Sequence, residues 1–254
     1  MAERVWDKFL TEQDKAHLAS SPRRGVGFGS RPALLYIDLY RWVFGDHPQP
    51  LLAGLKDWPG YCGMAGWEAL PHLQTLLRSA RAAGIPIIHI TGLHPADSGV
   101  PGWHESAHRD APRKPSADPA VQDRVRRQFD IVDEVAPLPG EVVLRKTSPS
   151  AFWGTPLADH LNYLGVDTLI VGGESTSGCV RASVVDGCTY RYRMMVVEEC
   201  VFDRHQACHA VNLFDMDQKY ADVIPVTAAV DYLQRWQAEN ARTATPAPAL
   251  AGAR

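Results

Sequence analysis

The chain has 254 residues, of which 45% are hydrophobic, and its formal net charge is −3. A chain of this length can bury one sizeable core, so we expect a single main domain. The small net charge gives no reason to expect nucleic acid or a membrane surface as a partner. The sequence contains no run of about 18 apolar residues that could span a membrane.

The N-terminal residues and the cysteines bear on the cellular compartment. Residues 1–14 are charged and lack the apolar core of a signal peptide. The 5 cysteines include no Cys-x-x-Cys pair, a pattern that fits neither a disulfide framework nor a zinc site. We therefore expect a cytoplasmic protein whose thiols stay reduced.

Composition divides the chain into three segments. Residues 1–31 are polar, and we expect them to form an N-terminal arm with one helix over residues 7–18. The main domain is expected over residues 32–240. Residues 241–254 are rich in alanine, proline and threonine, which predicts a disordered tail.

Within the main domain, apolar runs alternate with segments of helical periodicity. Short runs rich in branched residues predict buried strands over residues 33–37, 85–90, 142–144, 167–173, 194–198 and 222–226. Helices are predicted over residues 67–83, 156–164, 180–191, 205–220 and 228–238. Residues 40–66 are expected to form a loop with a single helical turn, and residues 92–127 a long irregular loop of the kind that often serves function. The alternation predicts a three-layer α/β/α, Rossmann-like fold with a six-stranded, mainly parallel sheet.

Polar residues follow the predicted strands at the points where these strands end. They are Asp38, Thr91, Lys146, Cys179 and Arg204. In open parallel sheets, ligands bind at the carboxyl ends of the strands. The sequence therefore predicts a binding or catalytic site at this edge of the sheet.

Cys179 lies in a glycine-rich turn that joins a predicted strand to a predicted helix. The first turn of a helix presents free N–H groups, which favour a thiolate and could hold an oxyanion. Because the thiolate is the nucleophilic form, Cys179 is a candidate nucleophile that should lose its proton readily. Two alternatives remain at this point: a small buried cysteine without chemistry, and a turn that cradles a phosphate.

Asp38 and Lys146 complete a candidate catalytic group. Asp38 could take the thiol proton as a general base, although a carboxylate at a strand end can also be structural. A nearby Lys146 ammonium would favour the thiolate and hold the carboxylate, but a solvated lysine is the common alternative. His160 and His209 lie in predicted helices, so a Cys-Asp-Lys group is favoured over a Cys-His-Asn arrangement.

Three sequence blocks resemble the cysteine hydrolases of the isochorismatase-like superfamily over residues 31–233. The blocks read Leu-Leu-Tyr-Ile-Asp up to Asp38, Arg-Lys-Thr-Ser-Pro-Ser-Ala-Phe around Lys146, and Gly-Gly-Glu-Ser-Thr-Ser-Gly-Cys-Val-Arg around Cys179. The resemblance implies that Cys179 is the nucleophile, Asp38 the base and Lys146 the cation. It also implies a cis peptide bond between Glu174 and Ser175, and an oxyanion hole formed by the N–H groups of Ser175 and Cys179.

Within the superfamily, the chain is most similar to N-carbamoylsarcosine amidohydrolase and its close relatives. In these enzymes the position of Arg204 binds a substrate carboxylate, for which a guanidinium is well suited. A surface role, or pairing with Asp203, is the alternative for Arg204. Thr176 is a candidate for hydrogen bonding to the substrate or for capping a helix.

The resemblance also bears on metals, cofactors and assembly. The Asp-x-His metal site of the nicotinamidase branch has no counterpart after the second strand, so we expect no metal and no cofactor. Whether His89 or His94 contributes to the site is left open. Trp103, Trp153 and Phe202 are candidates for a pocket wall or for core packing. Members of this family are commonly dimers or tetramers, which implies a homo-oligomer.

We therefore expect an amidohydrolase that releases ammonia from a small, carboxylate-bearing amide or N-carbamoyl compound resembling N-carbamoylsarcosine. The reaction would pass through a covalent thioester or S-carbamoyl intermediate on Cys179. Maleamate, biuret and ureidoacrylate are alternative substrates on the same scaffold. A protein that uses Cys179 only as a reactive thiol, without turnover, is the alternative from another class.

Overall fold

The computed structural model describes residues 4–94, 97 and 116–243. Within these residues the chain forms a six-stranded sheet in the order β3-β2-β1-β4-β5-β6. The strands are β1 (Pro32–Ile37), β2 (Ile87–Gly92), β3 (Val142–Lys146), β4 (Thr168–Glu174), β5 (Arg193–Phe202) and β6 (Asp222–Ile224). Every neighbouring pair is parallel, which confirms the predicted fold class.

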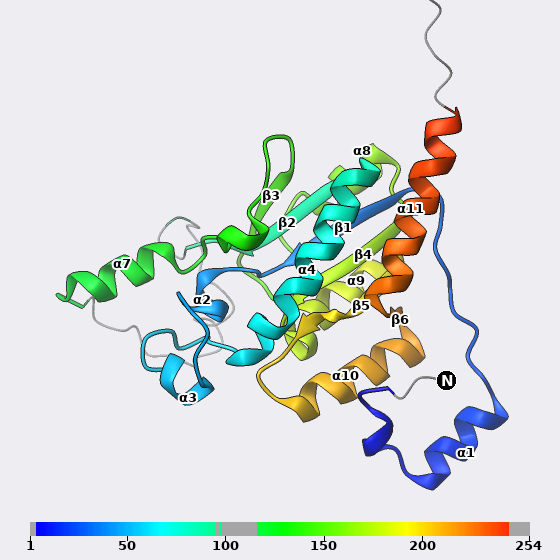
Figure 1. Cartoon of the computed structure of the whole chain (residues 1–254), viewed down its shortest axis with the longest axis horizontal. Coiled ribbons are helices and arrows are strands. Elements are labelled where there is room, and N and C mark those ends of the chain that lie inside the picture. The colour runs from blue at the N-terminus through cyan, green and yellow to red at the C-terminus, as the bar shows by residue number, and fades with distance from the viewer. Residues whose placement is uncertain (1–3, 95–96, 98–115, 244–254) are drawn as a thin grey trace, which may run out of the picture.

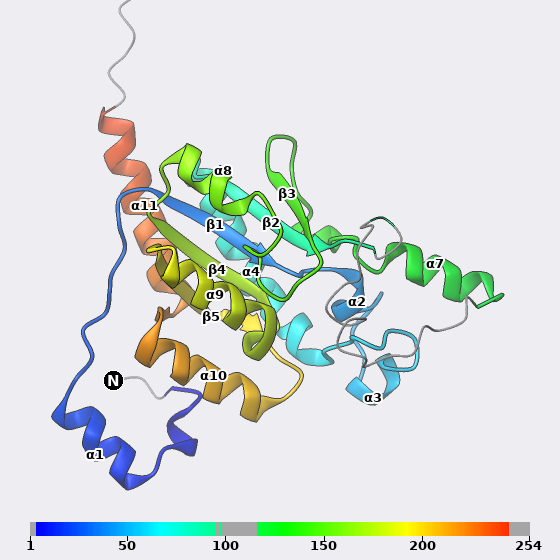
Figure 2. The same ribbon diagram turned by 180° about the vertical axis from the view of Figure 1, so that it is seen from behind.

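Helices cover both faces of the sheet and give the molecule three layers. Helices α4 (Met64–Ala83) and α11 (Val226–Thr243) lie on the face seen in Figure 1. Helices α8 (Leu157–Leu164), α9 (Arg181–Thr189) and α10 (Gln206–Lys219) lie on the face seen in Figure 2. Each interface contains its own apolar cluster. The central strands β1 and β4 are buried along their whole length, as apolar strands covered on both faces must be.

Alternate residues of β1 supply the two apolar clusters. Leu34 and Tyr36 pack toward α4, whereas Leu35 and Ile37 pack toward α8 and α9. This division follows from the strand geometry, because successive side chains point to opposite faces of a sheet. The carboxyl ends of β1 and β4, which bear the candidate residues, are therefore held by rigid packing on both sides.

Several elements differ from the sequence-based expectation. Helix α7 (Pro119–Arg127) lies within the segment predicted to be an irregular loop, and it extends away from the sheet (Figure 1). Asp118 caps this helix by accepting a hydrogen bond from the N–H of Ala120, and Pro119 occupies the first helical position. An Asp-Pro pair is a normal helix start. Two short helices, α2 (Arg41–Phe44) and α3 (Leu51–Gly54), lie in the preceding loop, where one turn was predicted.

Strand β5 is longer than predicted because its pairing with β4 contains an irregularity. Val171 pairs with Val196, whereas Gly173 pairs with Val201. The intervening residues include Glu198 and Glu199, whose charges interrupt the apolar pattern that predicts a strand. At the other end of the chain, helix α11 continues to Thr243. Residues 244–254, which make up most of the expected tail, lie outside the described residues.

The N-terminal arm packs against its own domain. Its helix, α1, spans Glu12–Ser20 and begins with a capping box between Thr11 and Asp14. Trp6 is buried in the apolar cluster beneath α8, α9 and α10, and the ring of Phe28 stacks on Tyr232 of α11 with centroids 3.9 Å apart. No helix in the described part of the chain is long and apolar enough to cross a membrane.

Candidate active site

Asp38 lies directly after β1 and is completely buried. Its N–H donates a hydrogen bond to the carbonyl oxygen of Ile90 at 2.9 Å, which ties it to the neighbouring strand β2. Its backbone has a φ of +58°, the left-handed conformation that aspartate tolerates better than most non-glycine residues. Asp38 therefore leaves the strand in a sharp turn that holds its carboxyl group in a defined position.

Lys146 joins the carboxylate to the candidate nucleophile. Its Nζ atom lies 2.8 Å from Oδ2 of Asp38 and 3.3 Å from Sγ of Cys179. The side chain of Lys146 is only 6% exposed. Three polar groups that are far apart in the sequence therefore meet at the carboxyl edge of the sheet.

The strand order explains how the three groups meet. Strands β1 and β4 are direct neighbours, so the residues that follow them are close together. Strand β3 is separated from β1 by β2, a distance of about two strand spacings of roughly 4.8 Å each. A long side chain such as that of Lys146 can cover this distance, whereas a short one could not.

Burial determines the electrostatics of the site. Burial raises the pKa of Cys179, the negative charge of Asp38 raises it further, and Lys146 lowers it only in part. Burial likewise raises the pKa of Asp38, and Lys146 opposes this rise. For Lys146 itself, burial lowers the pKa, but the charges of Asp38 and Cys179 outweigh this effect and the net shift is upward.

These directions correct one expectation. The sequence predicts a thiol that loses its proton readily, whereas the structure shows a thiol whose pKa is raised. A raised pKa disfavours the thiolate of Cys179, so formation of the thiolate would need a base close to the sulfur. Asp38, a carboxylate made more basic by burial, is held by the same Lys146 ammonium that contacts the thiol.

The turn that carries Cys179 is shaped by glycines and by an unusual peptide bond. Gly173 has a φ of +132°, and a Cβ atom there would lie 2.0 Å from the carbonyl oxygen of Ile37, so only glycine fits. The peptide bond between Glu174 and Ser175 is cis, as the resemblance implied. Cys179 then lies in a short π-helical turn, Thr176–Val180, immediately before α9 rather than within its first turn.

Two further residues hold this turn in place, and sequence reasoning missed both as contributors. Asp203 accepts hydrogen bonds from the N–H and the hydroxyl group of Ser177, at 2.9 and 2.6 Å. Ser183 donates to the carbonyl oxygen of Cys179 at 2.7 Å and accepts from the N–H of Ala151 at 2.9 Å. The block around Lys146 is thereby joined to the block around Cys179.

The structure places Thr176 and Arg204 in contacts that the sequence did not predict. Thr176 is fully buried, and its Oγ1 lies 2.8 Å from Nδ1 of His209. Arg204 donates from Nε to the carbonyl oxygen of Tyr61 at 3.0 Å and from Nη2 to that of Gly60 at 2.6 Å. The guanidinium forms no ion pair with Asp203 or with any other carboxylate of the described residues.

Glu174 adds a second buried carboxyl group beside the site. It is 8% exposed, and its Oε1 accepts a hydrogen bond from the thiol of Cys62 at 3.1 Å. Burial raises the pKa of Glu174 to about 8, and the charge of Asp38 contributes to this shift. A glutamate at the end of an apolar strand was the only sequence signal for this residue.

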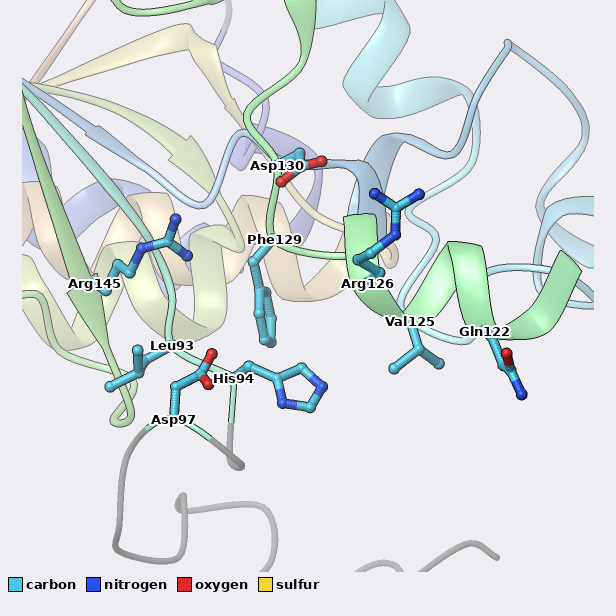
Figure 3. A pocket seen from close by; sticks show the side chains of 9 residues that line it. All are labelled: Leu93, His94, Asp97, Gln122, Val125, Arg126, Phe129, Asp130 and Arg145. Carbon is cyan, nitrogen blue, oxygen red and sulfur yellow. The ribbon is translucent and has the colours of Figure 1, made fainter. Parts of the chain in front are cut away.

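A separate cavity of about 510 Å³ lies beyond the ends of β2 and β3. Figure 3 shows that its lining comes from these strand ends and from the region of α7. The lining residues are Leu93, His94, Asp97, Gln122, Val125, Arg126, Phe129, Asp130 and Arg145. Arg145 lines this cavity whereas the adjacent Lys146 reaches the thiol, as expected for successive residues of a strand.

The remaining candidates of the sequence have other environments. Nε2 of His89 lies 2.9 Å from Glu141, which also pairs with Arg81. Among the residues that the structure describes, no group of three or more His, Cys, Asp or Glu residues could hold a metal ion. Phe202 is buried in the core, whereas Trp153 is 72% exposed. Trp103 lies outside the described residues.

Comparison with known proteins agrees with this architecture. The isochorismatase domain family matches residues 32–228. The chain is 39% identical over 216 residues to "Maleamate amidohydrolase" of Pseudomonas putida, with 82% of this chain and 90% of the relative covered. It is 32% identical over 213 residues to "N-carbamoylsarcosine amidase" of an Arthrobacter species, with 83% and 74% covered.

A solved structure shows the same fold. The cysteine hydrolase from Pseudomonas syringae pv. phaseolicola 1448A has a TM-score of 0.68 at 16% identity, with 85% of this chain and all of that chain covered. Together with the domain match, this defines a three-layer α/β protein of a known class. The chain belongs to the isochorismatase family, and the resemblance inferred from its sequence blocks is confirmed.

Proposed function

We propose that this chain is a cysteine-dependent amidohydrolase that releases ammonia from a small amide or N-carbamoyl compound bearing a carboxylate. The observation that carries the proposal is the contact of one buried ammonium, that of Lys146, with both the carboxylate of Asp38 and the sulfur of Cys179. The names of the two relatives, a maleamate amidohydrolase and an N-carbamoylsarcosine amidase, support the reaction class.

The first half of the reaction uses Asp38 as a base and then as an acid. Asp38 takes the proton of Cys179 as the sulfur attacks the amide or carbamoyl carbon. The N–H groups of Ser175 and Cys179 stabilise the oxyanion of the tetrahedral intermediate. When the C–N bond breaks, Asp38 passes the proton to the departing nitrogen, and ammonia leaves.

The second half removes the acyl or carbamoyl group from the sulfur. Asp38, again a carboxylate, takes a proton from water as the water oxygen attacks the thioester or S-carbamoyl carbon. Cleavage of the C–S bond returns the proton to the sulfur, which restores the thiol. Lys146 holds the carboxylate in place throughout and stabilises the transient negative charge on sulfur.

Arg204 supplies the preference for a carboxylate. Its guanidinium is half-buried and fixed through Nε and Nη2 by two backbone carbonyls of the loop at residues 60–61. Because no described carboxylate neutralises this cation, an anionic group of the substrate is a suitable partner for its remaining donors. Thr176 supports the turn through His209, and we assign it no more than an indirect role in binding.

Ammonia release from a panel of amides tests the proposal. The panel contains maleamate, N-carbamoylsarcosine, ureidoacrylate, biuret and nicotinamide, and we expect the carboxylate-bearing members to be preferred. Cys179→Ala should abolish turnover, whereas Cys208→Ala, which changes an exposed thiol, should not affect it. Ammonia release by the Cys179→Ala variant would refute the nucleophile assignment.

Two further experiments test the role of Arg204 and the class of function. Arg204→Ala should raise KM for a carboxylate-bearing amide by more than for a neutral amide, and an equal effect on both would contradict the anchoring role. Stoichiometric labelling of Cys179 by iodoacetamide, without turnover of any panel member, would favour a reactive-thiol protein over an enzyme.

A further inference from the structure

Glu174 occupies a position between the candidate base and the candidate carboxylate anchor. It is the last residue of β4, directly after the pair formed by Ile37 of β1 and Gly173 of β4. On its other side it pairs with Phe202, the last residue of β5. The chain continues from Ile37 to Asp38, and from Phe202 through Asp203 to Arg204. Glu174 is thus flanked by the strand ends that lead to these two functional residues.

The carboxyl group of Glu174 is buried, and it forms no ion pair with a cation of the described residues. Its one hydrogen-bond partner among the described residues is the thiol of Cys62, which donates to Oε1. Arg204 is near enough to influence Glu174 but forms no ion pair with it, because its Nε and Nη2 donate to backbone carbonyls. A buried carboxyl group that lacks a cationic partner is more stable in its neutral form.

The pKa of Glu174 lies closer to neutrality than those of the buried thiols and the phenol around it. Burial raises the pKa of Glu174 to about 8, and the charge of Asp38 acts in the same direction. Burial raises the pKa values of the Cys62 thiol and the Tyr40 phenol well above their usual values, and that of Cys179 is also raised.

The other charged neighbours of Glu174 are the Arg204 guanidinium and the carboxylate of Asp203. Asp203 accepts hydrogen bonds from Ser177, and its charge opposes ionisation of Glu174. Arg204 acts in the opposite direction. We therefore expect Glu174 to change its protonation near pH 8.

We propose that Glu174 is a specificity-determining residue that, in its neutral form, donates a hydrogen bond to the substrate carboxylate held by Arg204. This inference rests on the proposed function and deepens it. The neutral carboxyl group has one O–H to donate, and its second oxygen, Oε2, has no hydrogen-bond partner among the described residues. Once ionised, Glu174 places a second negative charge beside the same guanidinium and repels the substrate.

Substrate binding is therefore coupled to a proton on Glu174. A bound carboxylate stabilises the neutral form, so Glu174 stays protonated in the complex at pH values where it ionises in the free enzyme. The effect of pH should then appear in KM and much less in kcat. A residue that only supports the fold would not produce this separation.

Steady-state kinetics of the wild-type protein between pH 6 and about 9.5 provide the first test, with maleamate or N-carbamoylsarcosine as substrate. Above about pH 8, we expect KM for the carboxylate-bearing amide to rise by up to about tenfold per pH unit while kcat stays nearly constant. KM for the neutral diamide of the same size, maleamide, should not rise. An equal rise for both substrates would overturn the proposal.

Variants identify the titrating group. Glu174→Gln keeps a neutral hydrogen-bond donor, so KM at pH 7 should stay within a few fold of wild type and should no longer depend on pH. Glu174→Ala removes both the donor and the titrating charge, so KM should be higher than that of wild type at pH 7 and should no longer depend on pH. Glu198→Gln, which changes a partly buried glutamate paired with Arg4, serves as the control and should retain the wild-type pH profile. A wild-type profile in Glu174→Gln would refute the proposal.

An activity-independent measurement separates this inference from the proposed function. The infrared difference spectrum of wild type minus Glu174→Gln should show a protonated carboxyl band at pH 7 that disappears above about pH 8. Absence of the band at pH 7 would overturn the inference even if ammonia is released. If no panel member is hydrolysed, the proposed function fails, and the infrared band still decides whether Glu174 is neutral.

Discussion

Replacement of Lys146 by methionine tests the electrostatic arrangement on which the proposed mechanism depends. Methionine keeps much of the side-chain length and removes the charge. Asp38, which is completely buried, then loses the cation that lies 2.8 Å from its Oδ2. We expect Lys146→Met to destabilise the fold at neutral pH and to abolish most of the activity.

The magnitude follows from the burial of both partners. Removing one member of a buried ion pair costs about 3–5 kcal/mol, because the other charge is left uncompensated. This is a large share of a total free energy of unfolding of about 5–15 kcal/mol. A surface pair such as Lys219 with Asp215, whose lysine side chain is 59% exposed, should show little change when its lysine is replaced in the same way.

The destabilisation should depend on pH in a defined direction. Without Lys146, burial raises the pKa of Asp38 further above its unfolded value of about 3.9. Between these two pKa values the folded state binds more protons than the unfolded state, so stability falls as pH rises. The penalty is therefore smallest below about pH 4, where Asp38 is neutral in both states, and reaches its full size above the folded pKa.

Urea unfolding followed by tryptophan fluorescence and circular dichroism measures the effect at several pH values. A double-mutant cycle adds Asp38→Asn and the combined variant. The combined variant carries neither charge. We therefore expect its loss of unfolding free energy to be smaller than the sum of the losses in the two single variants, with a coupling energy of up to about 3 kcal/mol. A loss below about 1 kcal/mol for Lys146→Met at pH 8, or additive effects in the cycle, would refute the buried, coupled pair.

Two further substitutions test the backbone and the arm. Gly173→Ala should destabilise the fold by about 2 kcal/mol or more, because its Cβ would meet the carbonyl oxygen of Ile37 at 2.0 Å; unchanged thermal unfolding would contradict this geometry. Trp6 is 6% exposed, so Trp6→Ala should lower the free energy of unfolding by about 3 kcal/mol. Limited proteolysis should then cleave the arm more readily. Trp153→Ala, at a residue 72% exposed, is the control and should change stability by no more than about 0.5 kcal/mol; equal effects of the two substitutions would argue against a docked arm.

Local sequence patterns predicted the layers of the fold but not all of its boundaries. Apolar runs with branched residues predicted the strands because a parallel strand covered on both faces must be apolar throughout. The same rule ended the predicted fifth strand at Glu198, although β5 continues beyond it. The pairing with β4 is irregular at Glu198 and Glu199, and two charged residues interrupt the apolar pattern there. Helix α7 was missed because its segment was judged by its prolines, although the Asp118-Pro119 start is a helix signal.

The candidate site was predicted in composition but not in electrostatics. Asp38, Lys146 and Cys179 each lie at or shortly after the end of a strand, a position that is readable from sequence. The raised pKa of the Cys179 thiol could not be read in this way, because it depends on burial and on Asp38, more than a hundred residues away in the chain. Arg204 was predicted as an anchor, but its fixation by the carbonyls of Gly60 and Tyr61 depends on a loop with no recognisable pattern.

The sequence alone determined most of the elements and the chemical types of the residues at their ends, because strand burial, helix capping and glycine turns are local properties of the chain. Only the tertiary structure decided the strand order β3-β2-β1-β4-β5-β6, which places Asp38 beside the turn of Cys179 and puts both within reach of Lys146. It also decided the directions in which the pKa values of these groups are shifted. Protonation of a buried group depends on the solvent that packing excludes and on the charges that folding brings near, and both are long-range properties.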